Sequence, residues 1–423
     1  MNQKFLLILF LFPFLTTGQN FDTYFIDKQM RFDFILAGND KEATVYPEQI
    51  KMEPFWAGPK NNLIAPFNYG TYRFRVFDMD SGELIFSKGF STLFQEWQTT
   101  AEAKETGKTF YQAALFPFPQ QKVKLEICAR QWEGNFRTIY STIIDPENYF
   151  ILQETHEPIE SVTIVKNGKP DNKVDITILA EGYTTEEMDK FIEDSKRVSG
   201  FLFDAEPFKT EYKKFNVTAV FTPSLESGTD VPGEGIYRKT ALNSSFYTFD
   251  LPRYLTTTDM KSVYDAAAVV PTDHIYVLVN SDRYGGGGFY NFLSVCTADD
   301  ELTEPVFVHE FGHGFAGLGD EYYTSTVAYE DYYNLEIEPW EPNLTTLNNF
   351  SSKWETAIHD TIPVPTPREP AYKDVTGVFE GGGYINEGIY SPFMNCRMKS
   401  NNAKGFCPVC TGAIKKVIQY YAE

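Results

Sequence analysis

Apolar and polar residues alternate along the first third of the chain, with the two-residue period of half-buried β-strands. Residues 71–90 show this period on both sides of an Asp-Ser-Gly turn at 80–82, a pattern that predicts a β-hairpin. Segments 122–131 and 137–145 repeat the period, and no convincing helical periodicity accompanies them. We therefore predict an N-terminal β-sandwich over residues 19–155, with a structural or substrate-docking role.

The pattern changes near residue 160, where buried apolar runs begin to alternate with helical periodicity. Thr184 and Glu187 form a capping box ahead of apolar residues at helical spacing. Strands separated by helices predict an α/β domain with a mixed sheet over residues 156–423, so that the chain as a whole is an α+β two-domain protein. The predicted strands cover 173–183, 216–224 and 274–282, and the predicted helices cover 188–202 and 260–270.

Two connecting segments complete this organisation. The domain boundary is predicted near residues 151–162, which are polar and loop-like. Four consecutive glycines, 285–288, precede a further predicted strand that reaches Cys296. Because no Gly-Lys-Ser/Thr element follows these glycines, we interpret them as a flexible rim and not as a phosphate-binding loop.

The first residues have the organisation of a secretory signal peptide. Lys4 precedes an apolar run from Phe5 to Leu15, and small residues follow at Thr16–Gly18. The run is too short to cross a bilayer with ease, and no later stretch approaches the roughly 20 apolar residues of a membrane helix. We predict a signal peptide over residues 1–18, a protein that is secreted, periplasmic or at the cell surface, and no integral membrane segment after signal removal.

The net charge bears on the possible binding partners, and the cysteines bear on possible disulfides or metal sites. The formal net charge is −21, with 58 acidic against 37 basic residues, which argues against a nucleic-acid or anionic-membrane partner. In an exported protein, the cysteine cluster near the C-terminus predicts a disulfide between Cys396 and either Cys407 or Cys410. A zinc ion bound by these cysteines would need a fourth ligand, and the neighbouring sequence offers none.

The stretch "HEFGHGFAGLGD", residues 309–320, carries the candidate chemistry. His309 and His313 are four positions apart, so both imidazoles project from one face of a helix and can bind one ion. Glu310 directly follows the first histidine, where its carboxylate can reach a metal-bound water and accept the proton of that water. This pattern predicts a zinc site with Glu310 as the catalytic acid/base.

The third zinc ligand decides to which subclass of zinc peptidases such a site belongs. The metzincin pattern H-E-x-x-H-x-x-G-x-x-H/D has a glycine where this chain has Ala316. Gly317 and Gly319 permit a reversal one position later, and we therefore predict Asp320 as the third ligand. Glu321 is the local alternative, and a more distant glutamate, such as Glu330 or Glu336, would make the site gluzincin-like.

Longer motifs around this stretch resemble a known family. Residues 309–323, "ESGTDVPGEGIYRKTALNSSFYTF" at 226–249 and "CRMKS…GFCPVC" at 396–410 are similar to the IgA-peptidase-type zinc metallopeptidases of gut bacteria. The resemblance covers essentially the whole mature chain. It implies an exported, metzincin-like endopeptidase with an N-terminal β-domain, His309 and His313 as zinc ligands, Glu310 as acid/base and the aspartate of "GLGDEY", Asp320, as third ligand.

Three further assignments depend on the same class of enzyme. Met398, within "CRM", resembles the methionine turn beneath the zinc of metzincins, although an ordinary packing methionine is the alternative. Tyr384 or Tyr390 is a candidate for stabilising the oxyanion. The strand around residues 289–295 is a candidate for pairing with an extended substrate.

The sequence therefore predicts a monomeric, exported, zinc-dependent endopeptidase that acts on protein or peptide substrates. One alternative is a surface module that binds glycans or proteins and keeps a vestigial zinc site. The presence of Glu310 speaks against this alternative, because a non-catalytic site has no need of that carboxylate. The other alternative is a zinc hydrolase of a different amide, which we would expect to lack the Cys-x-Met turn.

Overall fold

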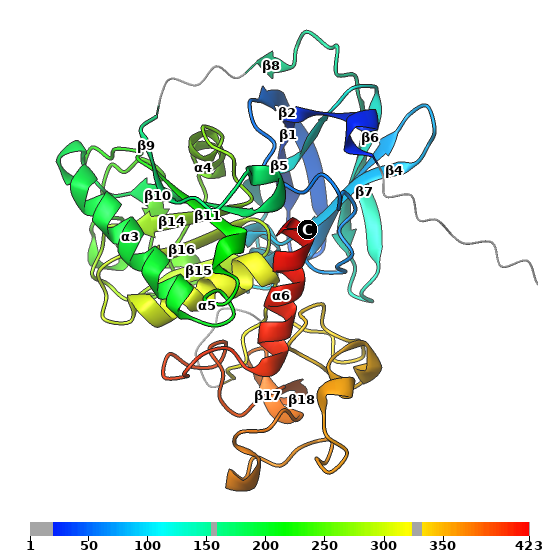
Figure 1. Cartoon of the computed structure of the whole chain (residues 1–423), viewed down its shortest axis with the longest axis vertical. Helices are drawn as coiled ribbons and strands as arrows, with labels where there is room; N and C mark the ends of the chain where they lie inside the picture. The colour runs from blue at the N-terminus through cyan, green and yellow to red at the C-terminus, as the bar shows by residue number, and fades with distance from the viewer. Residues whose placement is uncertain (1–19, 154–158, 324–331, 423) are drawn as a thin grey trace, which may run out of the picture.

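The computed structural model describes residues 20–153, 159–323 and 332–422. Over these residues the protein is a mixed α/β structure with several sheets and few helices (Figure 1). The predicted signal peptide, residues 1–18, lies outside the described residues. In the described part of the chain, no helix combines the length and apolarity needed to cross a membrane.

The N-terminal part contains two four-stranded sheets. Phe74 of one sheet lies 6.2 Å from Phe116 of the other, measured between ring centroids, and both rings are buried. The two sheets therefore contact each other through buried rings, and the β-sandwich itself stays a prediction. The first sheet has the order β5 (Lys108–Pro119), β1 (Phe25–Gly38), β2 (Ala43–Glu53), β8 (Leu152–Gln153), and the second has the order β4 (Leu84–Phe90), β3 (Tyr72–Asp78), β6 (Val123–Arg130), β7 (Phe136–Ile144).

Local patterning predicts these strands well but misses the short helices. The predicted hairpin is present as antiparallel β3 and β4, and Gly82 in its turn has a φ of 74°. Two helices that the periodicity did not show are α1 (Phe21–Tyr24) and α2 (Leu93–Gln98). The side chain of Thr92 caps α2 by accepting a hydrogen bond from the backbone N–H of Gln95. Helices of four and six residues are too short to display a helical period.

The second part is built on a six-stranded mixed sheet, in which β16, β14, β10 and β11 are parallel and the two edge strands are antiparallel. The predicted capping box of Thr184 and Glu187 is confirmed ahead of α3. The strand order is β15 (Gly286–Phe289), β16 (Leu293–Thr297), β14 (His274–Val279), β10 (Val174–Glu181), β11 (Phe215–Val220), β9 (Ser161–Val165), and the helices are α3 (Met188–Asp204), α4 (Met260–Ala267), α5 (Thr303–Ala316) and α6 (Pro408–Ala422).

The central sheet is buried on both faces, and each face belongs to a different core. Along β14, Ile275, Val277 and Val279 pack in the core that contains α4 and the N-terminal sheets. Tyr276 and Leu278, which alternate with them, pack in the core under α3, α5 and α6. Because successive strand residues point to opposite faces, a strand covered on both sides must be apolar throughout. The N-terminal sheets therefore cover one face of the central sheet.

The chain passes from the N-terminal sheets to the central sheet between β8 and β9, on either side of residues 154–158, which are not described. The predicted domain boundaries, 19–155 and 156–423, stay a prediction.

The remaining elements are short. Residues 332–407 fold below the central sheet in Figure 1, mostly as turns and 3-10 helices. The two small hairpins are β12 (Ser244–Ser245) with β13 (Thr256–Thr257) and β17 (Phe379–Gly382) with β18 (Ile385–Ser391).

Candidate metal centre

Helix α5 carries His309, Glu310 and His313 and ends just after them. Gly317 adopts the left-handed conformation, with a φ of 63°. Its N–H donates to the carbonyl of His313 at 3.0 Å, and the N–H of Leu318 donates to the carbonyl of Gly312 at 3.2 Å. The bond from Gly317 to His313 is that of the αL motif, which closes a helix with a left-handed residue and turns the chain back. The turn predicted at Gly317 is confirmed.

The turn brings Asp320 against the two histidines. The Nε2 atoms of His309 and His313 are 3.0 Å apart, and Asp320 Oδ1 lies 3.1 Å from the first and 3.3 Å from the second. Zinc held tetrahedrally by ligands at about 2.0–2.1 Å requires ligand atoms about 3.3–3.4 Å apart. The three atoms form a triangle only slightly smaller than that.

Hydrogen bonds around these residues leave the three inner atoms available to a cation. His309 Nδ1 donates to the carbonyl of Arg397 at 2.9 Å, and His313 Nδ1 donates to the carbonyl of Leu318 at 2.5 Å. Backbone acceptors at Nδ1 leave Nε2 as the ligand nitrogen. Asp320 Oδ1 is buried and accepts no hydrogen bond, whereas Oδ2 accepts one from the hydroxyl of Tyr384 at 2.7 Å. The donor set therefore fits a divalent metal ion.

The triad of proposed ligands, His309, His313 and Asp320, is packed closely together, and this packing shifts the pKa values of His313 and Asp320. Burial opposes ionisation of Asp320, but His313 and His309 outweigh it and hold the pKa of this carboxyl well below its usual range. Burial also disfavours a charged His313, but the carboxylate of Asp320 raises the pKa of His313 to about 9. These shifts show that the three groups together favour positive charge between them, which suits a metal ion.

Glu310 lies beside the triad and faces the same cleft. One of its carboxylate oxygens is within 4.8 Å of ring nitrogens of both His309 and His313. Burial raises the pKa of Glu310, and the two imidazoles partly offset this effect. A carboxyl whose pKa is raised in this way is better matched to accepting and returning a proton near neutral pH.

The alternative ligands are placed elsewhere. Glu321 follows Asp320 directly, but its Oε1 accepts hydrogen bonds from Asn343 Nδ2 at 3.0 Å and from Cys410 Sγ at 3.2 Å. Glu321 therefore belongs to a separate group of side chains. Glu336 is exposed, and Glu330 lies outside the described residues. Of the local pair, Asp320 is the residue that the structure brings to the histidines.

Aromatic residues line the cleft around the triad. Tyr384 lines it and bonds Asp320, whereas Tyr390 lies on β18 and is not among the described residues of the cleft wall. The N-terminal part contributes Glu96, whose carboxylate accepts a hydrogen bond from the hydroxyl of Tyr254 in the opposite wall. Neither Glu96 nor Tyr254 belongs to a motif that local sequence reveals. The other aromatic residues of the cleft are Tyr284, Phe289, Tyr290, Tyr322, Tyr332, Tyr333 and Trp340.

A larger groove adjoins the cleft. It runs between the N-terminal sheets, residues 332–357 and the start of α6. Tyr332, Tyr333, Trp340 and Glu341 line both hollows. The cleft and the larger groove therefore share part of their wall.

The four glycines are not a flexible rim, as the sequence had suggested, because three of them lie in the edge strand β15. A Cβ on Gly286 would lie 2.9 Å from Glu310 Oε1, and one on Gly288 would lie 2.5 Å from the carbonyl oxygen of Glu310 and 2.9 Å from His313 Cβ. The glycines let this strand approach α5 at the point where the helix carries its polar residues. The strand predicted to pair with an extended substrate also needs a correction. β16 is already hydrogen-bonded to a strand on each side, so the strand at the edge of the sheet is β15.

Replacing Gly288 by alanine is expected to push β15 away from α5 and to destabilise the protein by about 1–3 kcal/mol. Thermal unfolding measures this effect. Gly200→Ala is the matched control, because a Cβ at Gly200 in α3 meets nothing within 4 Å. That change is expected to raise stability slightly, since alanine favours helix. Equal behaviour of the two variants would contradict the packing argument.

Met398 lies directly beneath the helix. Its side chain is fully buried, and its Sδ is 2.9 Å from the position that a Cβ of Gly312 would take. The backbone beside it supports the centre, because the carbonyl of Met398 accepts a hydrogen bond from the N–H of Glu321 at 2.8 Å. This placement fits the methionine turn predicted for Met398, which stays a prediction.

The cysteines are not paired. All five are free, and the Sγ atoms of Cys396 and Cys410 are 3.8 Å apart. A disulfide requires about 2.05 Å between the sulfur atoms. The disulfide predicted between Cys396 and Cys407 or Cys410 is therefore wrong for this structure, although the three residues do gather in one place.

Comparisons with known families agree with this geometry. The family model described as IgA Peptidase M64 matches residues 162–372 and 368–418, which together make up more than half of the chain. A second model, described as Peptidase M64 N-terminus, matches residues 20–141. A search of curated proteins finds no match. The chain therefore belongs to the IgA peptidase M64 family, which is a family of metallopeptidases acting on proteins or peptides.

Proposed function

We propose that this protein is a secreted, zinc-dependent endopeptidase in which His309, His313 and Asp320 hold the metal and Glu310 is the catalytic acid/base. The observation that carries the proposal is the triangle of two imidazole nitrogens and one unpartnered carboxylate oxygen, with edges of 3.0–3.3 Å, beside the Glu310 carboxylate. Zinc is the metal that this combination of nitrogen and oxygen donors favours when a fourth position is left for water or substrate. Secretion rests on the predicted signal peptide alone.

Each protein group has a distinct task in peptide hydrolysis. Zinc bound here would supply polarisation of the scissile carbonyl and a lowered pKa for water. Glu310 accepts the proton of the attacking water and then delivers it to the leaving amine nitrogen. Tyr384 holds the outer oxygen of Asp320, which orients the inner oxygen toward the histidines. The carbonyls of Arg397 and Leu318 orient the two imidazoles in the same way.

The edge strand supplies a surface for the substrate backbone. β15 lines the cleft, and its Gly286 already forms a bridge with Tyr254. The outer edge of residues 287–289 can add an extended peptide as a further strand. The groove that adjoins the cleft accommodates chain beyond the scissile bond, which supports cleavage within a protein over removal of terminal residues.

A direct assay tests the proposal. The mature protein, loaded with zinc, is expected to cleave a mixture of denatured proteins and to create new internal termini that mass spectrometry identifies. A chelator is expected to abolish this cleavage, and added zinc is expected to restore it. Absence of cleavage by a preparation in which metal analysis finds bound zinc would refute the peptidase proposal. Binding of proteins or glycans without cleavage would instead favour the vestigial-site alternative.

A further inference from the structure

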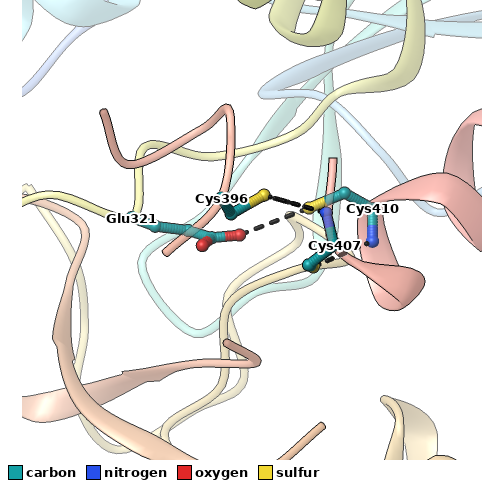
Figure 2. A group of neighbouring side chains, drawn as sticks. All are labelled: Glu321, Cys396, Cys407 and Cys410. Atoms are coloured by element: carbon teal, nitrogen blue, oxygen red, sulfur yellow. Dashed lines mark hydrogen bonds between the residues drawn. The ribbon is translucent and has the colours of Figure 1, made fainter. Parts of the chain in front are cut away.

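A second group of ligand atoms lies next to the proposed catalytic centre. Glu321, Cys396, Cys407 and Cys410 each offer one oxygen or sulfur atom, and these four atoms all lie within 4.8 Å of one another. Figure 2 shows the carboxylate and the thiols pointing toward one common space. All four side chains are buried, with 0–4 % of their surface exposed. They come from the turn after α5, the Met398 segment and the start of α6.

The distances fit a metal ion better than a disulfide. Tetrahedral zinc with sulfur ligands at about 2.3 Å places neighbouring sulfur atoms about 3.8 Å apart. Cys396 Sγ and Cys410 Sγ are 3.8 Å apart, and Cys410 Sγ is 3.2 Å from Glu321 Oε1. Three thiols and one carboxylate also complete the four-ligand set of a closed structural site.

The surroundings of the group are those of charged ligands. Glu321 Oε2 is buried without any hydrogen-bond partner, although its neighbour Oε1 has two. A buried carboxylate oxygen left in this state is costly unless a cation compensates it. Backbone N–H groups point at two of the sulfurs, from Cys407 to Cys396 Sγ at 3.2 Å and from Cys410 to Cys407 Sγ at 3.5 Å. Such donors stabilise sulfur atoms that ligate a metal.

We propose that Glu321, Cys396, Cys407 and Cys410 bind a second zinc ion, whose role is structural. Thiolate donors favour zinc over calcium or magnesium, and four protein ligands leave no position open for substrate. The fourth ligand that the sequence around the cysteines did not offer is Glu321, which the chain reversal after α5 brings to them.

The second ion would hold the first site together. Glu321 directly follows Asp320 in the sequence, and its backbone N–H donates a hydrogen bond to the carbonyl of Met398. Cys396 adjoins Arg397, whose carbonyl accepts the Nδ1 proton of His309. A metal joining Glu321, Cys396 and α6 therefore restrains both the third catalytic ligand and the orientation of a histidine. The two adjacent acidic residues therefore belong to different sites: Asp320 to the proposed catalytic site and Glu321 to the proposed structural zinc site.

Metal counting tests the second site independently of activity. The native protein is expected to bind two zinc ions per chain. A variant with His309→Ala and His313→Ala is expected to keep one, and X-ray absorption at the zinc edge should then show sulfur ligands at about 2.3 Å. A native protein with one zinc and no sulfur ligation would overturn the proposal, as would a disulfide between any two of Cys396, Cys407 and Cys410 found by intact mass. Peptide cleavage by such a protein would still support the proposed catalytic function.

Cysteine variants give a second measurement. Cys407→Ser is expected to lower the zinc content from two to one per chain and to lower the melting temperature. Cys128→Ser is the matched control, because Cys128 lies in β6 and does not belong to this group, so that the change should leave two zinc ions bound. Equal zinc content in the two variants would contradict the assignment. If the Cys407 variant does not fold, sulfur ligation in the native protein decides the question.

Discussion

Replacing Glu310 by glutamine is expected to lower kcat/KM for peptide cleavage by about 10²–10⁴-fold, the usual contribution of a general acid/base. Glutamine has nearly the same shape as glutamate but cannot accept a proton at its amide. The metal should stay bound, because the proposed ligands are His309, His313 and Asp320. The variant therefore separates proton transfer from metal binding.

The raised pKa of Glu310 suits this residue to proton transfer. The other described carboxylates of the cleft are engaged elsewhere, since Asp320 faces the histidines, Glu341 accepts a hydrogen bond from Tyr333 and Glu96 accepts one from Tyr254. Turnover of a fluorogenic peptide at constant zinc and direct metal analysis provide the two measurements. Glu301→Gln, an exposed change just before α5, is the matched control and should leave both values unchanged. Full activity of the Glu310 variant would exclude Glu310 as the acid/base.

Replacing Arg31 by methionine is expected to reduce the free energy of unfolding by about 3–5 kcal/mol, the usual result of removing one partner from a buried ion pair. Arg31 is fully buried and lies 2.6 Å from Asp33, 3.2 Å from Glu53 and 2.7 Å from Asp265 of α4. Methionine retains the packing of the arginine stem but leaves the carboxylates of Asp33 and Glu53 buried without their guanidinium. Because α4 belongs to the second part of the chain, the loss also weakens the contact between the two parts.

The pH dependence of this loss distinguishes charge from packing. Burial raises the pKa of Glu53, and Arg31 opposes that rise. In the variant the folded-state pKa of Glu53 should rise further above the unfolded value, so the folded form binds more protons and loses stability as pH increases. The deficit should therefore be larger at pH 8 than at pH 5, as measured by thermal unfolding. A loss of the same size at both pH values would show that packing, not charge, is responsible.

A surface arginine provides the control for the same substitution. Arg75 is 37 % exposed in its ion pair with Glu126, so Arg75→Met should cost no more than about 1 kcal/mol. A comparable loss in both variants would contradict the special role of the buried cluster.

Elements with a clear period were predicted correctly, whereas short elements were not. The hairpin of β3 and β4, the capping box before α3 and the buried strands β10 and β14 all carry their signal in neighbouring residues. Helix α2 contains too few residues for a period. The strand β15 consists mostly of glycine, so it has no side chains with which to form a pattern.

In the candidate site, too, the residues with a local sequence signal were predicted and those that depend on distant contacts were not. His309, Glu310 and His313 share one helix, and the geometry of a helix is the same in every protein. The choice between Asp320 and Glu321 depends instead on how the chain turns after Gly317 and on what surrounds each carboxylate. Tyr384 reaches Asp320 from a distant hairpin connection, and no spacing rule predicts such a contact.

The sequence by itself determined the family, the His-Glu-x-x-His pattern of the helix and most of the regular strands, because these depend on residues that are near one another along the chain. Only the tertiary structure decided which acidic residue meets the histidines, and it brought Glu321 to three cysteines that had suggested a disulfide. It also showed that the N-terminal sheets and one face of the central sheet share a core. These results depend on packing between segments far apart in the chain, and local periodicity carries no information about such contacts.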